Sequence, residues 1–235
     1  MSEGINLDEF PIDTDALWSS VSNREAKESI AKEIVARASD GEVIGFGSGT
    51  TSMVCAIAFG QAVKDGLGIS AVVTSYELEW LCTKLGIDVL DLPSTHIDWC
   101  FDGADEVDPQ SNLLKGRGGA MHRERQVFEV ANKRLIVADP SKDVSVLGEK
   151  FPAPVEINPI NAVEVMKELS SMGFDEVALR TGQGKDGPII TEAGNVIADI
   201  IFRPGFDMEL ASKISSIEGV VDTGLFMGFD FERLS

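Results

Sequence analysis

One stretch of the chain, residues 102–124, gathers the side chains best suited to chemistry. It reads DGADEVDPQSNLLKGRGGAMHRE, so four carboxylates precede a lysine, a glycine-rich segment and a glutamate. An apolar, alternating run over residues 97–101 comes just before it and predicts a buried strand. In open α/β sheets, ligands bind outside the carboxyl ends of the strands. Because a buried carboxylate is costly unless it is paired, this group of like charges indicates a functional site rather than core packing.

A second informative stretch is the glycine and hydroxyl loop GSGTTS at residues 47–52. It joins a predicted strand (42–46) to a predicted helix (53–63), and it matches neither a Walker A motif nor GxGxxG. Glycines let a ligand approach the backbone, and the helix N-terminus offers unpaired N–H groups and a positive dipole end. The loop therefore suits a phosphate. A tight strand-to-helix turn with a capped helix is the alternative that these residues leave open.

The hydrophobic pattern predicts the strands and helices that would position residues 47–52 and 102–124. Strands and helices alternate over residues 42–142, which predicts a parallel, doubly wound sheet. A capping box at Ser22–Glu25 opens the first predicted helix. The predicted strands are 42–46, 69–73, 87–90, 97–101 and 135–138, and the predicted helices are 22–38, 53–63, 76–85 and 123–132.

A proline-rich segment at residues 151–154 marks a predicted domain boundary. The pattern after it is βαββαβ, the ferredoxin-like split arrangement. Its elements are a strand at 155–157, a helix at 162–172, a strand at 176–180, a hairpin-like pair at 189–190 and 196–202, a helix at 208–217 and a strand at 220–226. The predicted fold class is α/β, with an acidic extension (1–20), a doubly wound domain (21–150), a smaller α+β domain (151–228) and a C-terminal tail (229–235).

Composition narrows the possible partners and location. The chain has 235 residues and a formal net charge of −19, which disfavours nucleic acid and anionic membrane surfaces as partners. No apolar run approaches the roughly 20 residues that span a bilayer, and the N-terminus lacks the features of a signal peptide. Three cysteines at wide spacing favour a reducing, cytoplasmic setting, and only two histidines leave little for a transition-metal site. We interpret the negative charge as a solubility or high-salt adaptation.

The chain closely resembles the type A ribose-5-phosphate isomerases between residues 27 and 226. The motifs that carry the resemblance are GSGTT (47–51), DGADEVD (102–108), KGRGGAMHRE (115–124) and ADPSK (138–142). The resemblance implies a Rossmann-like domain with a ferredoxin-like one. It also implies interconversion of ribose 5-phosphate and ribulose 5-phosphate in the non-oxidative pentose phosphate pathway, without metal or organic cofactor, by a homodimer or homotetramer.

Carried over motif by motif, the resemblance implies that Glu124 is the proton-transferring base and that Lys27 is a weaker match to an N-terminal lysine of the family. The implied substrate contacts are Ser48, Gly49, Thr50, Thr51, Asp102, Gly103, Ala104, Asp105, Lys115, Gly116, Arg117, Gly118 and Lys142. The chain departs from the family in its additional N-terminal segment. It also ends soon after the last predicted strand, which leaves open whether a C-terminal strand returns to the first sheet.

Aldose–ketose isomerisation moves a proton between adjacent carbons through a cis-enediolate. It needs a carboxylate base, here Glu124, and positive charge where the oxyanion develops, here Lys115. Asp102 or Asp105 would relay a proton between the sugar oxygens. The alternative for Glu124 is an exposed, salt-bridged glutamate in a first helical turn. Glu106 and Asp108 are interpreted as turn or ion-pair residues.

Two other functions remain as alternatives. An amino-sugar-phosphate deaminase could use a similar loop but would need a histidine near its acids, and neither His96 nor His122 obviously serves. A non-catalytic, sugar-phosphate-sensing domain of a regulator would need a DNA-binding helix-turn-helix, for which residues 1–20 are too short and too acidic. Such a domain would also have no need for the full set of acids and lysine.

Overall fold

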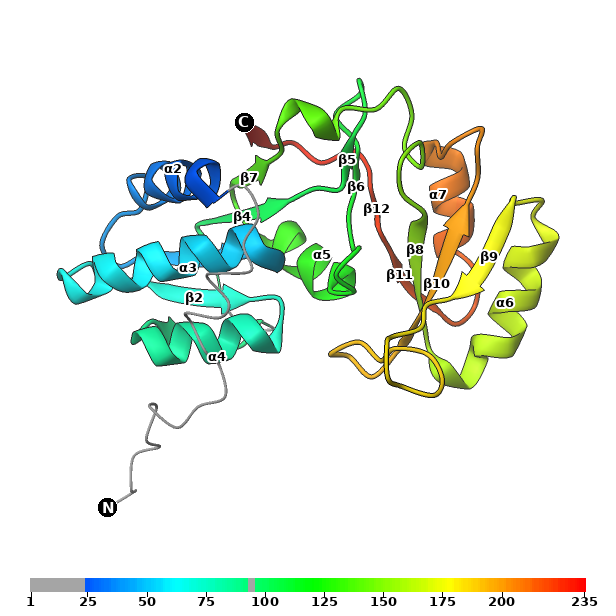
Figure 1. The fold of residues 1–235 in the computed structure, drawn as a ribbon, viewed down its shortest axis with the longest axis horizontal. Helices are drawn as coiled ribbons and strands as arrows, with labels where there is room; N and C mark the ends of the chain where they lie inside the picture. The colour runs from blue at the N-terminus through cyan, green and yellow to red at the C-terminus, as the bar shows by residue number, and fades with distance from the viewer. Residues whose placement is uncertain (1–23, 93–95) are drawn as a thin grey trace, which may run out of the picture.

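The computed structural model describes residues 24–92 and 96–235 and contains a six-stranded, a four-stranded and a three-stranded sheet (Figure 1). The predicted extension at 1–20 and the first residues of the predicted capping box lie outside the described residues.

The six-stranded sheet is parallel throughout, with strand order β13-β7-β4-β1-β2-β3, so the predicted α/β class with a doubly wound parallel sheet is confirmed. Its strands are β1 (Val43–Phe46), β2 (Ser70–Val73), β3 (Asp88–Val89), β4 (Trp99–Gly103), β7 (Arg134–Val137) and β13 (Glu232–Leu234). The helices around it are α2 (Arg24–Val35), α3 (Gly49–Lys64), α4 (Tyr76–Leu85) and α5 (Met121–Val130).

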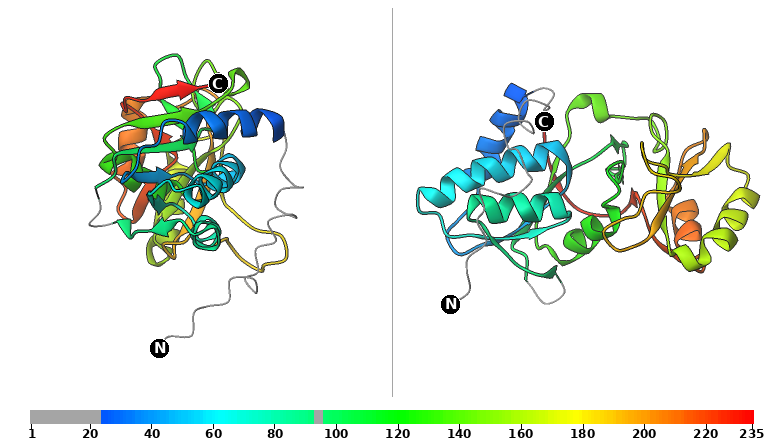
Figure 2. Two further views of the ribbon diagram at one scale, coloured as in Figure 1. Left: turned by 90° about the vertical axis from the view of Figure 1, so that its left-hand side faces the viewer. Right: turned by 60° about the horizontal axis from the view of Figure 1, so that its bottom comes forward.

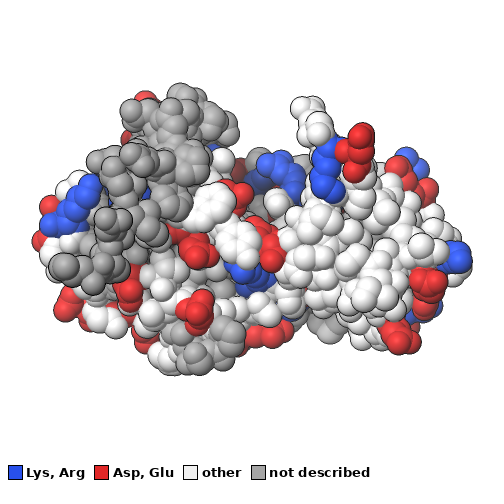
Figure 3. All heavy atoms as spheres, turned by 90° about the horizontal axis from the view of Figure 1, so that it is seen from below, with Lys and Arg blue, Asp and Glu red and all other residues white. Residues whose placement is uncertain are grey.

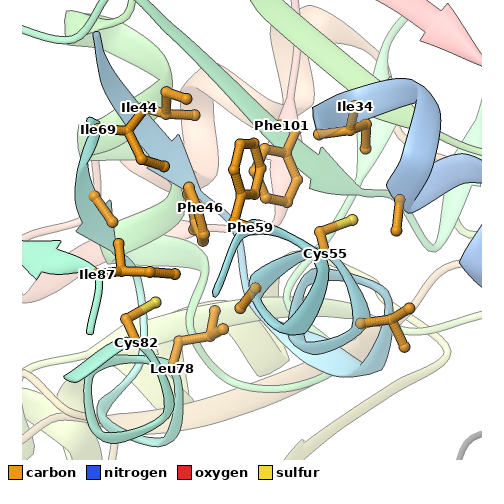
Figure 4. Packing of buried hydrophobic residues seen from close by; sticks show 14 of the residues in the cluster. Ile34, Ile44, Phe46, Cys55, Phe59, Ile69, Leu78, Cys82, Ile87 and Phe101 are labelled. Atoms are coloured by element: carbon orange, nitrogen blue, oxygen red, sulfur yellow. The ribbon is translucent and has the colours of Figure 1, made fainter. Parts of the chain in front are cut away.

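Alternate residues of these strands bury opposite faces of the sheet. Phe46 and Phe101 pack against Phe59 of α3, with ring centroids 4.8 to 6.1 Å apart, in a core that α2, α3 and α4 cover (Figure 4). Cys100 and Ile136 face the other way, into a core that α5 covers. The helix that carries Glu124 therefore lies on the opposite face of the sheet from α3, the helix that the glycine loop precedes.

The four-stranded sheet is antiparallel, with strand order β11-β8-β10-β9, and it confirms the predicted βαββαβ pattern. Its elements are β8 (Ala153–Ile157), α6 (Ala162–Ser171), β9 (Glu176–Leu179), β10 (Val196–Ile201), α7 (Met208–Ser215) and β11 (Val220–Thr223). The strand predicted at 189–190 does not form, and β10 pairs with β9 instead. The glycine-rich segment before residue 190 forms only an isolated bridge, from Thr181 to Pro188.

A small sheet that the sequence analysis did not predict joins the two larger ones. Its strands are β5 (Glu106–Val107), β6 (Leu113–Leu114) and β12 (Leu225–Phe226). The single strand predicted over 220–226 is split at Gly224, whose backbone bonds to Pro154 on one side and to Lys115 on the other. Only glycine fits there, because a Cβ would lie 2.2 Å from the Lys115 carbonyl oxygen. Two-residue strands are too short to show the alternation from which strands are predicted.

The structure corrects the prediction that residues 229–235 are a C-terminal tail. Residues Glu232–Leu234 form β13, which pairs in parallel with β7 at the edge of the six-stranded sheet (Figure 1 and Figure 2). Leu234 is buried in the core under α2 and α3. A three-residue strand carries no periodic signal, so only its long-range pairing identifies it. The returning C-terminal strand that the sequence left open is therefore present.

Acidic and basic side chains are scattered over the face on which a depression separates the two parts of the molecule (Figure 3). Among the described residues, no helix is both long enough and apolar enough to cross a membrane.

Candidate active site

A pocket of about 630 Å³ opens at the carboxyl ends of β1 and β4, the neighbouring strands from which the chain leaves in opposite directions along the sheet. Every predicted site residue lines it: Ser48, Gly49, Thr50, Thr51, Asp102, Gly103, Ala104, Asp105, Lys115, Gly116, Arg117, Gly118, Glu124 and Lys142. A larger surface hollow of about 1060 Å³ lies among α4, β3 and α5 and contains none of them. The pocket at the strand ends is therefore the candidate site.

The glycine loop brings the start of α3 against Asp102. A Cβ on Gly47 would lie 2.0 Å from the Asp102 carboxyl carbon, so only glycine fits there. Gly49 has a φ of +86°, which favours glycine at the start of α3. The helix thus begins four residues before the predicted Met53. Ser48 occupies the N-cap position but makes no side-chain cap, so its hydroxyl leaves the first N–H groups of the helix to a ligand.

The Ser48 hydroxyl instead donates to Glu124 Oε1 at 2.6 Å. Glu124 lies in the first turn of α5 and is 3% exposed, so the alternative of an exposed, salt-bridged surface glutamate is wrong. Its second oxygen, Oε2, is buried and accepts no hydrogen bond from the described residues. One oxygen is therefore oriented by Ser48, while the other keeps its lone pairs for a ligand.

Lys115 ties the two carboxylates together. Its Nζ lies 2.8 Å from Asp102 Oδ2 and 3.3 Å from Glu124 Oε2, and it donates to the Gly103 carbonyl at 2.5 Å. All three side chains are at most 5% exposed. Burial and the neighbouring Glu124 charge raise the pKa of Asp102 from 3.8 to about 7. Although burial opposes it, the attraction of both carboxylates raises the pKa of Lys115, which stays protonated at neutral pH.

We expect the Asp102→Asn variant to reveal this pKa through the pH dependence of stability. Because folding raises the pKa of Asp102, the folded state binds the proton more tightly. The contribution of this group to the unfolding free energy therefore falls as pH rises from about 4 to about 7 and stays low above that. Asparagine does not titrate, so the variant should gain stability relative to the parent chain between pH 5 and pH 8. Urea unfolding of both chains at pH 5 and at pH 8 measures this difference in unfolding free energy. A loss of stability by the variant, relative to the parent chain, on going from pH 5 to pH 8 would contradict the raised pKa of Asp102.

Positive charge collects at the other end of the pocket. Lys27 Nζ donates to Thr50 Oγ1 at 2.8 Å, beside the N-terminus of α3. Partial burial and the nearby Lys142 charge lower the pKa of Lys27. Two lysines close enough to repel each other beside a positive helix end make a site that an anion would stabilise. This end of the pocket supplies the locally positive setting that an anionic ligand needs in a chain of net charge −19.

Asp105 and Arg117 form the rim of the pocket. The Asp105 carboxylate accepts the Arg117 backbone N–H at 3.1 Å, and the exposed Arg117 guanidinium lies 3.9 Å from it. The side chains of Arg117 and Lys142 both lie over the Phe151 ring, at 5.6 and 5.9 Å from its centroid. Phe151, in the segment 151–154 that marks the predicted domain boundary, therefore helps to hold the two cations of the rim.

Glu106 and Asp108, the other two acids of residues 102–108, stabilise the backbone and do not line the pocket. Glu106 is fully buried, and its carboxylate accepts the backbone N–H groups of Gly148, Lys150 and Phe151. Asp108 accepts N–H groups of its own turn, which agrees with its interpretation as a turn residue. Glu106 does not line the pocket, in agreement with a structural interpretation, but it lies in β5 and binds backbone N–H groups rather than a turn of its own or a cation among the described residues. A carboxylate that three N–H groups satisfy is stable in a core.

Sequence reasoning missed several residues of the pocket wall: Ala26, Ile30, Val137, Asp139, Ser141 and Ser235. Asp139 and Ser141 lie within the ADPSK motif and could have been found from it, whereas Ser235 reaches the pocket only because β13 pairs with β7. Among the described ranges, no group of three or more histidine, cysteine, aspartate or glutamate side chains is arranged to hold a metal ion.

Fold and pocket together are typical of an α/β enzyme that combines acid–base groups with a site for an anionic small molecule. Comparison with known proteins gives the particular family. The family model of ribose 5-phosphate isomerase A (phosphoriboisomerase A) matches residues 70–233. The chain belongs to the ribose 5-phosphate isomerase A family, and it is accordingly an isomerase.

Individual relatives agree with this assignment. Ribose-5-phosphate isomerase A of Methanocaldococcus jannaschii is 38% identical over 89% of this chain and 93% of its own length, and its structure superposes with a TM-score of 0.83. The enzyme of Haloarcula marismortui is 38% identical over 86% of this chain and 88% of its own. A D-ribose-5-phosphate isomerase solved in complex with phospho-erythronic acid is 35% identical, with a TM-score of 0.82 over 90% of this chain and 93% of that one.

Proposed function

We propose that this chain interconverts D-ribose 5-phosphate and D-ribulose 5-phosphate by proton transfer through a cis-enediolate. One observation carries the proposal: the Ser48 hydroxyl at the start of α3 donates to Glu124, so the anion-binding helix end and the carboxylate base share one pocket. A relative bound to phospho-erythronic acid, a phosphorylated sugar acid, supports a sugar phosphate as the ligand.

Glu124 is the base in this mechanism. Its Oε2 removes the proton from C2 of the open-chain aldose and returns it to C1, while Ser48 keeps the carboxylate oriented through Oε1. The Lys115 ammonium stabilises the negative charge that develops on the sugar oxygens. Asp102, with a pKa of about 7, can both give and take a proton at neutral pH, so it relays the proton between the O1 and O2 atoms of the sugar.

The phosphate would lie at the N-terminus of α3, between Lys27 and Lys142. Because this contact is the same in substrate and transition state, we expect Lys142→Met to raise KM about 10- to 100-fold with little change in kcat. Initial rates over a range of ribose 5-phosphate concentrations measure both constants. Lys167→Met on the exposed side of α6 is the matched control and should change neither. A fall in kcat at unchanged KM would argue against a phosphate contact.

A coupled isomerase assay on ribose 5-phosphate tests the function directly. Unphosphorylated ribose should be a very poor substrate, because it lacks the group that the lysines bind. Ammonia release from glucosamine 6-phosphate tests the deaminase alternative in the same preparation. Ammonia production without ketopentose formation would replace the proposed reaction with deamination.

We expect a chelator to leave the rate unchanged, because in the proposed mechanism the Lys115 ammonium, which lies beside Asp102 and Glu124, stabilises the oxyanion in place of a metal ion. The measurement is the initial rate before and after prolonged treatment with EDTA. Loss of activity that added divalent metal restores would point instead to a metal-assisted hydride shift.

We also propose that the chain works in the cytoplasm as a homodimer or homotetramer. A reducing compartment is supported by Cys55, Cys82 and Cys100, which are all free and buried, and whose thiol pKa burial raises to about 12. Such thiols are unreactive and need no disulfide partner. Light scattering on the purified chain measures the oligomeric state.

A further inference from the structure

The four-stranded sheet turns one face toward the candidate active site. Along β10, Val196, Ala198 and Ile200 pack in the core beneath α6 and α7, whereas Ile197 packs with residues of α5 and β4 in the core of the six-stranded sheet. Asp199 shares the face of Ile197, because alternate residues of a strand point to the same side. Figure 1 shows α6 and α7 on the side of this sheet away from α5. A carboxylate on this face can thus act on the loop that carries Lys115.

Arg180 connects Asp199 to that loop. Its Nε and Nη2 donate to the two carboxylate oxygens of Asp199 at 2.8 and 2.5 Å, a bidentate pair. Its Nη1 donates to the carbonyl oxygens of Gly116 and Arg117 at 2.9 and 3.0 Å. The Arg180 side chain is only 15% exposed. One planar guanidinium therefore fixes two successive carbonyls of the glycine-rich loop, with its own orientation set by Asp199.

The direction of these carbonyls decides where the N–H groups of the loop point. The peptide bonds are trans, so the N–H of each peptide unit points opposite to its C=O. With the carbonyls of Gly116 and Arg117 turned to Arg180, the N–H groups of Arg117 and Gly118 are turned away from it. The first of these donates to Asp105 in the pocket. The second belongs to Gly118, at which a Cβ would lie 3.8 Å from the Ser48 hydroxyl that orients Glu124.

We propose that Arg180, oriented by Asp199, is a positioning residue for the isomerisation: it keeps the carbonyls of Gly116 and Arg117 out of the pocket and the N–H groups toward it. The inference rests on the proposed function and adds two residues outside the pocket wall to it. The Gly116 carbonyl also accepts the Gly119 N–H at 2.9 Å, so the Arg117 carbonyl depends most on Arg180. Without Arg180, the peptide between Arg117 and Gly118 could turn and present its carbonyl oxygen to the pocket. A carbonyl there would repel the enediolate more than the neutral sugar carbons of the substrate, so the loss falls on kcat.

Steady-state kinetics of Arg180→Met give the first test. We expect kcat to fall about 10- to 100-fold, less than the roughly 100- to 1000-fold cost of removing an oxyanion donor, because the N–H groups are misdirected rather than removed. KM should stay within about threefold of the parent value. Arg203→Met is the matched control, because Arg203 is an 82% exposed arginine that pairs with Asp175 beside the same sheet and does not contact the loop. It should keep the parent kcat. An unchanged kcat in Arg180→Met would overturn the proposal.

Two further variants separate positioning from a general loss of stability. Ethylguanidinium added to Arg180→Ala should restore part of kcat, and ethylammonium should not, because only the planar cation can bridge a carboxylate and two carbonyls. Asp199→Asn should lower kcat less than Arg180→Met, and the double variant should be no worse than Arg180→Met alone if the two act as a unit. Additive losses, or equal rescue by both cations, would contradict a shared positioning role.

Hydrogen exchange keeps this test independent of the proposed function. In Arg180→Met the backbone amide of Arg117 should exchange faster than in the parent chain, with core amides of β10 unchanged. A parent chain without isomerase activity would defeat the proposed function, yet exchange would still report whether Arg180 holds the loop. Unchanged exchange at Arg117 would overturn the positioning role even in an active enzyme.

Discussion

The Glu124→Gln variant is expected to bind ribose 5-phosphate but to lose at least about 100-fold in kcat, the usual scale for a general base. Glutamine keeps the size of the side chain and can still accept the Ser48 hydrogen bond, yet its amide cannot remove a proton from carbon. It also removes one of the two carboxylates that flank Lys115. The loss should therefore appear in kcat, while KM changes little because the phosphate contacts proposed at α3 are untouched.

Steady-state kinetics measure both constants, and isothermal titration with phospho-erythronic acid measures binding apart from turnover. Glu129→Gln is the matched control, since Glu129 lies on the same helix, is exposed and does not line the pocket. It should behave as the parent chain. Near-parental kcat in Glu124→Gln would remove Glu124 from the mechanism.

Lys115→Met carries the other large expected effect, because it removes charge that two buried carboxylates share. We expect kcat to fall about 100- to 1000-fold through loss of oxyanion stabilisation. We also expect the unfolding free energy to fall by about 3 to 5 kcal/mol, because breaking a buried ion pair leaves its partners uncompensated. Urea unfolding measures the second effect, and Lys133→Met, an exposed lysine before β7, is the control that should change neither quantity.

A double variant distinguishes the two effects of losing Lys115. Adding Asp102→Asn to Lys115→Met removes one of the uncompensated charges, so it should recover part of the lost stability without recovering activity. Recovery of activity in the double variant would show that Lys115 matters only for folding. Stability equal to that of the parent chain in Lys115→Met would contradict the buried ion-pair arrangement.

Local features of the sequence were sufficient to predict the fold class and to place the two site loops. The alternation of strands with helices specified the parallel sheet, since that pattern is local to each element. The glycine loop was predicted at the end of β1 and the acids at the end of β4, and parallel strands bring such ends to one edge. Every residue predicted to contact substrate consequently lines one pocket, although the role of each remains a prediction.

Two features could not be predicted because they depend on contacts between residues far apart in the sequence. One is which acids line the pocket and which are structural, and the other is the position of the short strands. Glu106 and Asp102 are four residues apart in one motif, yet only Asp102 lies in the pocket, because the loop at 148–151 supplies N–H groups to Glu106. β13 has no periodic signal and exists through its pairing with β7.

The sequence by itself determined which residue types stand at the ends of β1 and β4, because turn glycines and strand alternation are properties of neighbouring residues. The tertiary structure alone decided that Ser48 meets Glu124 across 76 positions of the chain. It also decided that Arg180, directly after β9, donates to the carbonyls of Gly116 and Arg117 in the loop after Lys115. The physical reason is that hydrogen bonds between distant segments form only when the loops, helices and sheets that carry them pack together. Local sequence patterns do not predict how distant segments pack against one another.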